Sequence, residues 1–96
     1  MRERKVEKRL VEEVKKIGGK SYKISSPGNA GFPDRMCVFP GGKVFFVETK
    51  RPKNELVSAR QKHQISILKK LGCDVRIIKN YNEISEFVCE VMTNEV

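Results

Sequence analysis

Apolar residues recur along this chain at two spacings, one typical of helices and one typical of strands. Val6, Leu10, Val14 and Ile17 follow the helical spacing and predict an amphipathic helix that ends at Gly18-Gly19. Shorter apolar runs bounded by turn residues come next, and each predicts a strand. These strands are expected over residues 21–24, 35–39 and 43–49.

The second half of the chain continues the alternation of helix and strand. Ser58, followed three residues later by Gln61, predicts a capping box at the start of a second helix. An apolar run over residues 75–78 predicts a strand, and Asn80 or Asn82 is expected to cap a last helix. The residues expected to point inward are Ile65, Leu68 and Leu71 in the second helix and Ile84, Phe87, Val88 and Val91 in the last.

The predicted order is α-β-β-β-α-β-α, which implies an α/β fold with a mixed central sheet flanked by helices. The 96 residues are enough for one domain with one core, so we expect a single domain over residues 1–96. No apolar stretch approaches the ~20 residues of a membrane span, and no apolar segment follows the charged first residues as in a signal peptide. We therefore expect a protein of the cytoplasm.

The cysteines agree with an intracellular location. There are three, widely spaced and each among apolar neighbours, and no Cys-x-x-Cys motif or Cys/His cluster is present. A zinc site is therefore not expected, and the pattern favours reduced thiols in the core. These residues are Cys37, Cys73 and Cys89.

A hairpin between the second and third predicted strands would bring two acidic residues together. Asp34 precedes the first of these strands, Glu48 lies near the end of the other, and Pro40-Gly41-Gly42 between them is a tight-turn signal. Because side chains alternate along a strand, Glu48 and Lys50 project to the same side. Two neighbouring carboxylates repel each other unless a divalent cation joins them. The pattern therefore indicates metal-dependent chemistry.

The residue types fit hydrolysis of a phosphodiester. Asp34 and Glu48 supply hard oxygen ligands for Mg²⁺ or Mn²⁺, and the carbonyl of Thr49 is a further candidate ligand. Such an ion binds a phosphate oxygen, lowers the pKa of a bound water and stabilises charge in the displacement. Lys50 would hold the attacking water or the phosphate. The alternatives are that Asp34 is a turn residue and that Glu48 and Lys50 form an ion pair on an exposed strand.

The charge of the chain favours a nucleic-acid partner over a merely well-solvated surface. The net charge is +8, and it is unevenly distributed. Residues 49–70 hold seven Lys or Arg against one acid, whereas residues 81–96 hold four glutamates and no Lys or Arg. The residues expected to contact nucleic acid are Lys23, Arg51, Lys53, Arg60 and Lys62.

The acids Glu7, Asp34 and Glu48, the glycines Gly28 and Gly31, and Gln61 belong to short motifs that follow one another along the chain. Together, these motifs resemble the VRR-NUC family of the PD-(D/E)xK nuclease superfamily. The resemblance spans nearly the whole chain, from Val6 to Glu86. In place of the Val-Arg-Arg of the family name, Lys62-His63-Gln64 follow Gln61. The motifs that carry the resemblance are Glu7, Ser26-Pro27-Gly28, Gly31-Phe32-Pro33-Asp34, Phe46-Val47-Glu48-Thr49-Lys50 and Gln61.

The resemblance implies a restriction-endonuclease-like fold and a role for two further residues. It makes Glu7 the first acid of the site, in contact with a second metal directly or through water, and it places Gln61 in the catalytic set. Glu7 could instead be solvated or paired with Arg4 or Lys15, and Gln61 could be only the partner of Ser58 in the helix cap.

The resemblance also implies an activity, namely metal-dependent endonucleolytic cleavage of branched DNA of the Holliday-junction type by a symmetric homodimer. Such a protein would work in the cytoplasm of a bacterial cell or of a phage-infected host. A nuclease for flaps or single-stranded DNA stays open, as does a nucleic-acid-binding module without turnover. A third alternative is a regulatory or structural partner whose basic face binds an acidic protein.

Overall fold

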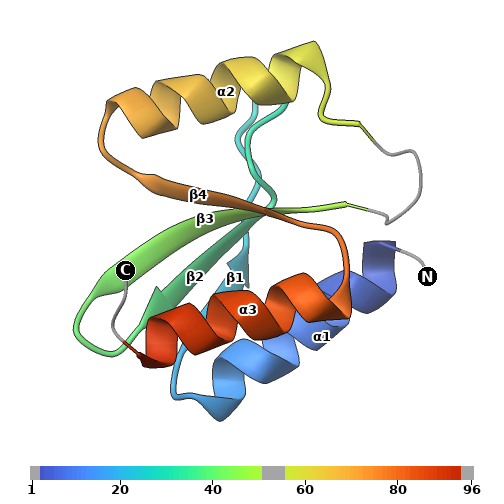
Figure 1. Cartoon of the computed structure of the whole chain (residues 1–96). Helices are drawn as coiled ribbons and strands as arrows, with labels where there is room; N and C mark the ends of the chain where they lie inside the picture. The colour runs from blue at the N-terminus through green and yellow to red at the C-terminus, as the bar shows by residue number, and fades with distance from the viewer. Residues whose placement is uncertain (1–2, 51–55, 94–96) are drawn as a thin grey trace.

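The computed structural model describes residues 3–50 and 56–93, and its elements follow the predicted order (Figure 1). They are α1 (Glu3–Lys16), β1 (Lys20–Lys23), β2 (Arg35–Phe39), β3 (Lys43–Thr49), α2 (Ala59–Lys70), β4 (Asp74–Ile78) and α3 (Tyr81–Met92). In this described part of the chain, no helix is long and apolar enough to cross a membrane.

The strands form one mixed sheet in the order β1-β2-β3-β4. The first three strands are antiparallel, with Arg35 opposite Val47 at one end of the β2–β3 ladder. Asp34 precedes Arg35 and Glu48 follows Val47, so both acids lie just beyond this end of the ladder. β4 runs parallel to β3, as the intervening helix α2 requires, because a parallel connection must cross over a face of the sheet. The predicted hairpin and mixed sheet are confirmed.

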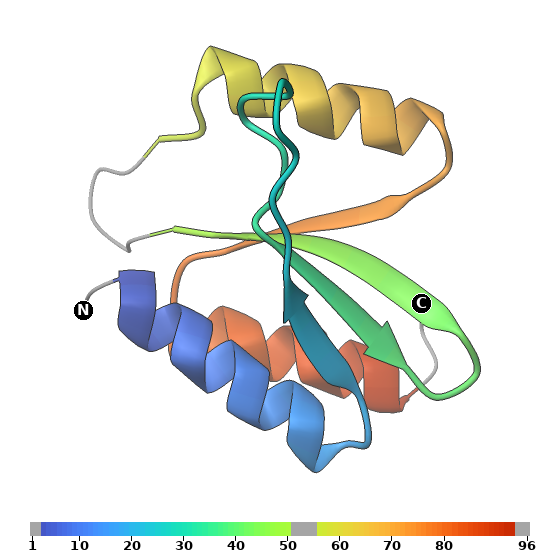
Figure 2. The same ribbon diagram turned by 180° about the vertical axis from the view of Figure 1, so that it is seen from behind.

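The helices cover the two faces of the sheet unequally. α1 and α3 lie side by side on one face and α2 lies alone on the other (Figures 1 and 2). The larger core cluster packs α1 and α3 against the sheet, and it contains Val6, Leu10, Val14, Phe39, Phe45, Val47, Ile84 and Phe87. The smaller cluster lies under α2 and is built on Ile65, Leu68 and Val75. α2 is therefore held by less apolar contact than the other two helices.

Some sequence predictions need correction. Leu71, expected to point inward, is 75% exposed because α2 ends at Lys70 and Leu71 becomes its C-cap. Cys89, expected in the core, is exposed on α3, whereas Cys37 is buried and Cys73 is intermediate. Burial raises the pKa of the Cys37 thiol. Helical periodicity alone could not place Cys89, which lies next to the inward-facing Val88.

Candidate active site

Thr49, the residue after Glu48, holds the carboxylate of Asp34. Its Oδ1 accepts a hydrogen bond from the Thr49 main-chain N–H at 3.2 Å, and its Oδ2 accepts one from the Thr49 hydroxyl at 2.9 Å. Thr49 is fully buried, so its hydroxyl has little freedom to point elsewhere. This pair ties the residue before β2 to the end of β3 and sets the orientation of the Asp34 carboxylate. Asp34 is therefore more than a turn residue.

Glu48 is the centre of a second group of contacts. Its Oε2 accepts a hydrogen bond from Gln61 Nε2 at 2.9 Å and lies 3.6 Å from the Lys50 ammonium. The side chains of Glu48 and Lys50 are each only 9% exposed. The two residues do form an ion pair, but a buried one at the end of a central strand rather than on an exposed strand. A buried pair of this kind rarely serves stability alone, because removing both charges from water is costly.

Gln61 closes the cap of α2 and also contacts Glu48. Its main-chain N–H and its Oε1 complete the capping box with Ser58, at 3.1 and 2.9 Å. Its remaining amide group then donates to Glu48. The cap holds the side chain in the orientation that reaches Glu48, so the alternative of a helix cap without contact to the site is wrong.

Glu7 faces the site from α1 and is paired across the fold. Its Oε2 accepts hydrogen bonds from Lys23 Nζ on β1 at 2.9 Å and from Arg35 Nε on β2 at 3.0 Å. Partial burial by itself would raise the pKa of Glu7, but these hydrogen bonds and the two positive charges lower it below its ordinary value. The structure therefore does not support the alternatives of a solvated side chain or a pair with Lys15, and the side chain of Arg4, the other alternative partner, lies outside the described part of the chain.

The pKa of Asp34 shifts in the opposite direction to that of Glu7. Burial raises the pKa of Asp34 above its ordinary value, and the nearby negative charge of Glu7 adds to this, while the hydrogen bonds from Thr49 act in the opposite sense. A cation bound at Asp34 would reverse that shift, since an adjacent positive charge favours the ionised form. The Asp34 environment is therefore one that a cation would stabilise.

The donor set fits a magnesium or manganese ion. Each carboxylate has about four acceptor positions, so the contacts of Asp34 with Thr49 use only part of its capacity. Within the described residues, no group of three or more His, Cys, Asp or Glu side chains is placed to hold a metal. Mg²⁺ does not need one, because it keeps several waters and is often held by one or two carboxylates together with substrate phosphates. Asp34, Glu48 and the Thr49 carbonyl would supply the protein ligands.

These contacts lie near the first turns of α1 and α2 and the last residues of β3. Figure 2 shows the beginnings of α1 and α2 on the side of the molecule at which β3 ends. A solved structure described as "VRR_NUC domain" superposes on this chain with a TM-score of 0.84 and 27% identity, and covers 90% of this chain and 92% of that one. The chain has the fold of that VRR-NUC domain.

Sequence comparison finds similarity to a phage protein named as a nuclease. The chain is 56% identical over 52 residues to "Putative nuclease p44" of Acyrthosiphon pisum secondary endosymbiont phage 1. That match covers 54% of this chain and 56% of the phage protein, so the chain spans little more than half the length of that relative. No family model matches the chain.

The residues expected to contact nucleic acid fall into three groups. Arg60 and Lys62 are exposed near the start of α2, beside Gln61. Lys23 is exposed at its tip but paired with Glu7. Arg51 and Lys53 lie outside the described residues.

Sequence reasoning missed one residue with a part in the site, Arg35, and the packing role of another, Gly31. Arg35 follows Asp34 directly and holds Glu7, yet in sequence it reads as one more surface cation at the start of a strand. Gly31 packs against the main chain of α2: a Cβ there would lie 2.5 Å from the carbonyl carbon of Arg60 and 2.7 Å from Gln61 N. Its place in the Gly-Phe-Pro-Asp motif indicated that Gly31 matters. Its packing partners Arg60 and Gln61 lie 29 and 30 positions later in the sequence, so only the fold shows the contact.

Proposed function

We propose that this chain is a Mg²⁺- or Mn²⁺-dependent DNA endonuclease. The observation that carries the proposal is the placement of two acids at the adjoining ends of neighbouring strands, with a buried lysine two residues after one of them. Asp34 is oriented by Thr49, and Glu48 by Gln61 and Lys50. A chain with the VRR-NUC fold and this arrangement has the groups that hydrolysis of a phosphodiester requires.

Each residue of the site would have its own role in the reaction. Asp34, Glu48 and the Thr49 carbonyl would hold the ion, which binds a phosphate oxygen and lowers the pKa of a bound water. Lys50 places an ammonium beside Glu48, where it would orient the attacking water or stabilise negative charge on the phosphate. Gln61 keeps the Glu48 carboxylate in position. Glu7, held by Arg35 and Lys23, would contact a second ion through water.

The positive surface supports DNA as the substrate, with phosphate contacts that carry no sequence information. We propose branched DNA, such as a Holliday junction, cut by a homodimer in the cytoplasm of a bacterial or phage-infected cell. A two-fold-symmetric substrate cut twice calls for a two-fold-symmetric enzyme. Sedimentation of the protein alone and with a four-way junction measures that stoichiometry, and one chain per junction would contradict the dimer.

Substitution of the two acids tests the site. Asp34→Asn and Glu48→Gln each remove a charged ligand with little change in shape, so cleavage of branched DNA in Mg²⁺ or Mn²⁺ should fall by at least about 100-fold. Glu86→Gln, on an exposed residue of α3, is the matched control and should cut at the wild-type rate. Circular dichroism checks that each variant is folded. Full activity of a folded Asp34 or Glu48 variant would reject the site.

A further inference from the structure

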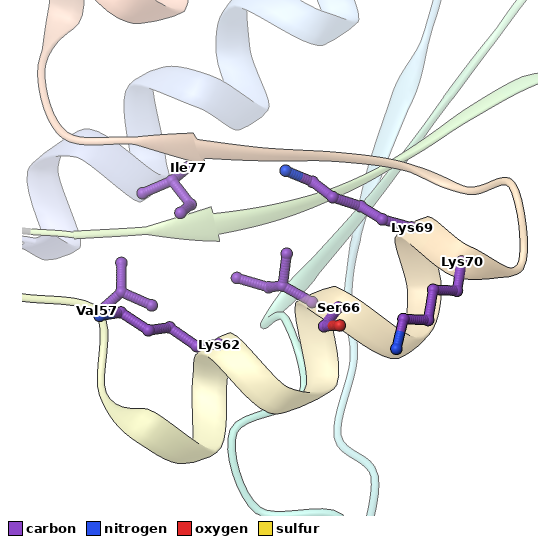
Figure 3. Close-up of a pocket in the computed structure, with 7 residues that line it drawn as sticks. Val57, Lys62, Ser66, Lys69, Lys70 and Ile77 are labelled. Carbon is purple, nitrogen blue, oxygen red and sulfur yellow. The ribbon is translucent and has the colours of Figure 1, made fainter.

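A cleft of about 560 Å³ lies between α2 and the sheet, beside strand β4 (Figure 3). Its floor is aliphatic, formed by Val57, Ile65 and Ile77, and Ile77 is 36% exposed on β4. Three cations on α2 line it as well, namely Lys62, Lys69 and Lys70. None of the described residues that line the cleft is acidic. The surface of the cleft therefore combines an apolar floor with positive charge alone.

The cleft and the candidate active site share helix α2. Lys62 follows Gln61, whose amide contacts Glu48. From Lys62 to Lys69 the helix rises about 10 Å, at roughly 1.5 Å per residue, so the lysines form a track that leads away from the carboxylates. α2 itself contains no acidic residue that could neutralise these lysines from the same helix.

The combination of positive charge and apolar surface restricts the kinds of partner that the cleft can bind. Duplex DNA presents mainly phosphates and sugars to a surface without base readout, and lysines alone would serve it. An unpaired strand also exposes the flat apolar faces of its bases, which pack on apolar side chains while cations follow its backbone. A second copy of the chain fits poorly, because a two-fold contact through this cleft would bring the lysines of both copies together.

We propose that the cleft between α2 and β4 binds an unpaired DNA strand next to the active site. This rests on the proposed nuclease function and selects among branched substrates: one that carries a single-stranded arm is preferred to a fully paired four-way junction. The lysines at positions 62, 69 and 70 contact the phosphates, and the aliphatic floor receives one or more bases.

Binding of a fluorescein-labelled oligothymidine, followed by anisotropy in EDTA, tests the lysines. The double variant Lys69→Gln/Lys70→Gln should bind about tenfold more weakly, and the slope of log K against log salt should shrink by about 1.4, at 0.7 per phosphate contact. Lys15→Gln/Lys16→Gln is the matched control, since it removes the same charge from the last turn of α1. Equal losses in the two double variants would reject the track.

The floor is tested by Ile77→Thr, which keeps a β-branched residue on the strand. We expect binding of oligothymidine to weaken about three- to tenfold while a blunt duplex of equal length binds as before. Val44→Thr, at a residue 42% exposed on β3, is the control and should change neither. Equal weakening for duplex and single strand would overturn the proposal, as would a change in oligomeric state with oligothymidine binding intact. Unchanged binding of both DNAs by Ile77→Thr would overturn it too.

The titrations contain no metal, so they do not depend on cleavage. A chain that binds oligothymidine through the cleft but never cuts DNA rejects the proposed function and leaves the cleft assignment standing. A chain that cuts DNA, but whose cleft variants bind like their controls, rejects only the cleft assignment.

Discussion

At the scale of single residues, Gly31 fixes how closely the loop before β2 approaches α2. Figure 2 shows this loop leaving the sheet and reaching the helix. The contact is with the main chain at Arg60 and Gln61, which cannot move aside as a flexible side chain would. Because Gln61 holds Glu48, the loop that leads to Asp34 and the helix that supports Glu48 are positioned together.

Gly31→Ala should therefore disturb both stability and the site. Gly31 has φ +90° and Gly28 has φ +82°, but a Cβ at Gly28 would meet nothing within 4 Å. Gly28→Ala thus costs only the backbone strain, about 1–2 kcal/mol, and Gly31→Ala should cost at least about 2 kcal/mol more. Denaturant unfolding of the two variants measures the difference. Equal unfolding free energies would show that the loop does not press on α2.

At the scale of the elements, one arginine joins three of them. Arg76 on β4 forms ion pairs with Asp74 at 2.7 Å and with Glu90 of α3 at 2.8 Å. Its guanidinium also lies 5.5 and 5.6 Å from the ring centres of Phe45 and Phe87. β4 is an edge strand, so this residue links the edge to the helix that covers it.

Replacing Arg76 with lysine keeps the charge and loses the planar contacts. Arg76→Lys should lower the free energy of unfolding by about 1–2 kcal/mol, because lysine can neither bridge both acids nor stack on the rings as arginine does. Arg9→Lys is the control: Arg9 also pairs with a carboxylate and lies over Tyr81, but its side chain is 46% exposed. It should cost less than about 0.5 kcal/mol. Similar costs for both would argue against a linking role for Arg76.

At the scale of the whole molecule, Glu7 connects α1 to β1 and β2 through charge. Its pKa lies below the ordinary value of 4.5 because of Lys23 and Arg35, although burial acts in the opposite sense. A carboxyl group whose pKa is lowered by folding stabilises the fold above its unfolded pKa. That contribution is lost as the pH falls from about 4.5 through the lower folded value.

The acid dependence of unfolding tests this connection. In EDTA, the wild type should be more stable than Glu7→Gln at neutral pH, and the two should converge as the pH falls below 4.5. Glu12→Gln removes the same charge from an exposed residue of the same helix and is the matched control. Urea titrations across the acid range measure these curves. A gap between wild type and Glu7→Gln that stays constant with pH would contradict the assignment.

The sequence by itself determined the order of elements, the hairpin and the central acids, because these depend on contacts that are local or nearly so. Alternation along a strand and a tight turn are enough to set Asp34 beside the end of β3. The capping box was equally readable, since Ser58 and Gln61 are three residues apart.

Only the tertiary structure decided which distant groups hold the acids. Arg35 and Lys23 meet Glu7 across 28 and 16 positions of sequence, and Gln61 meets Glu48 across 13. The spacing of residues along a chain carries no information on such pairs, because packing of helices on the sheet sets their distances. The cleft under α2 has the same origin: its floor joins β4 to α2, and neither element alone predicts it.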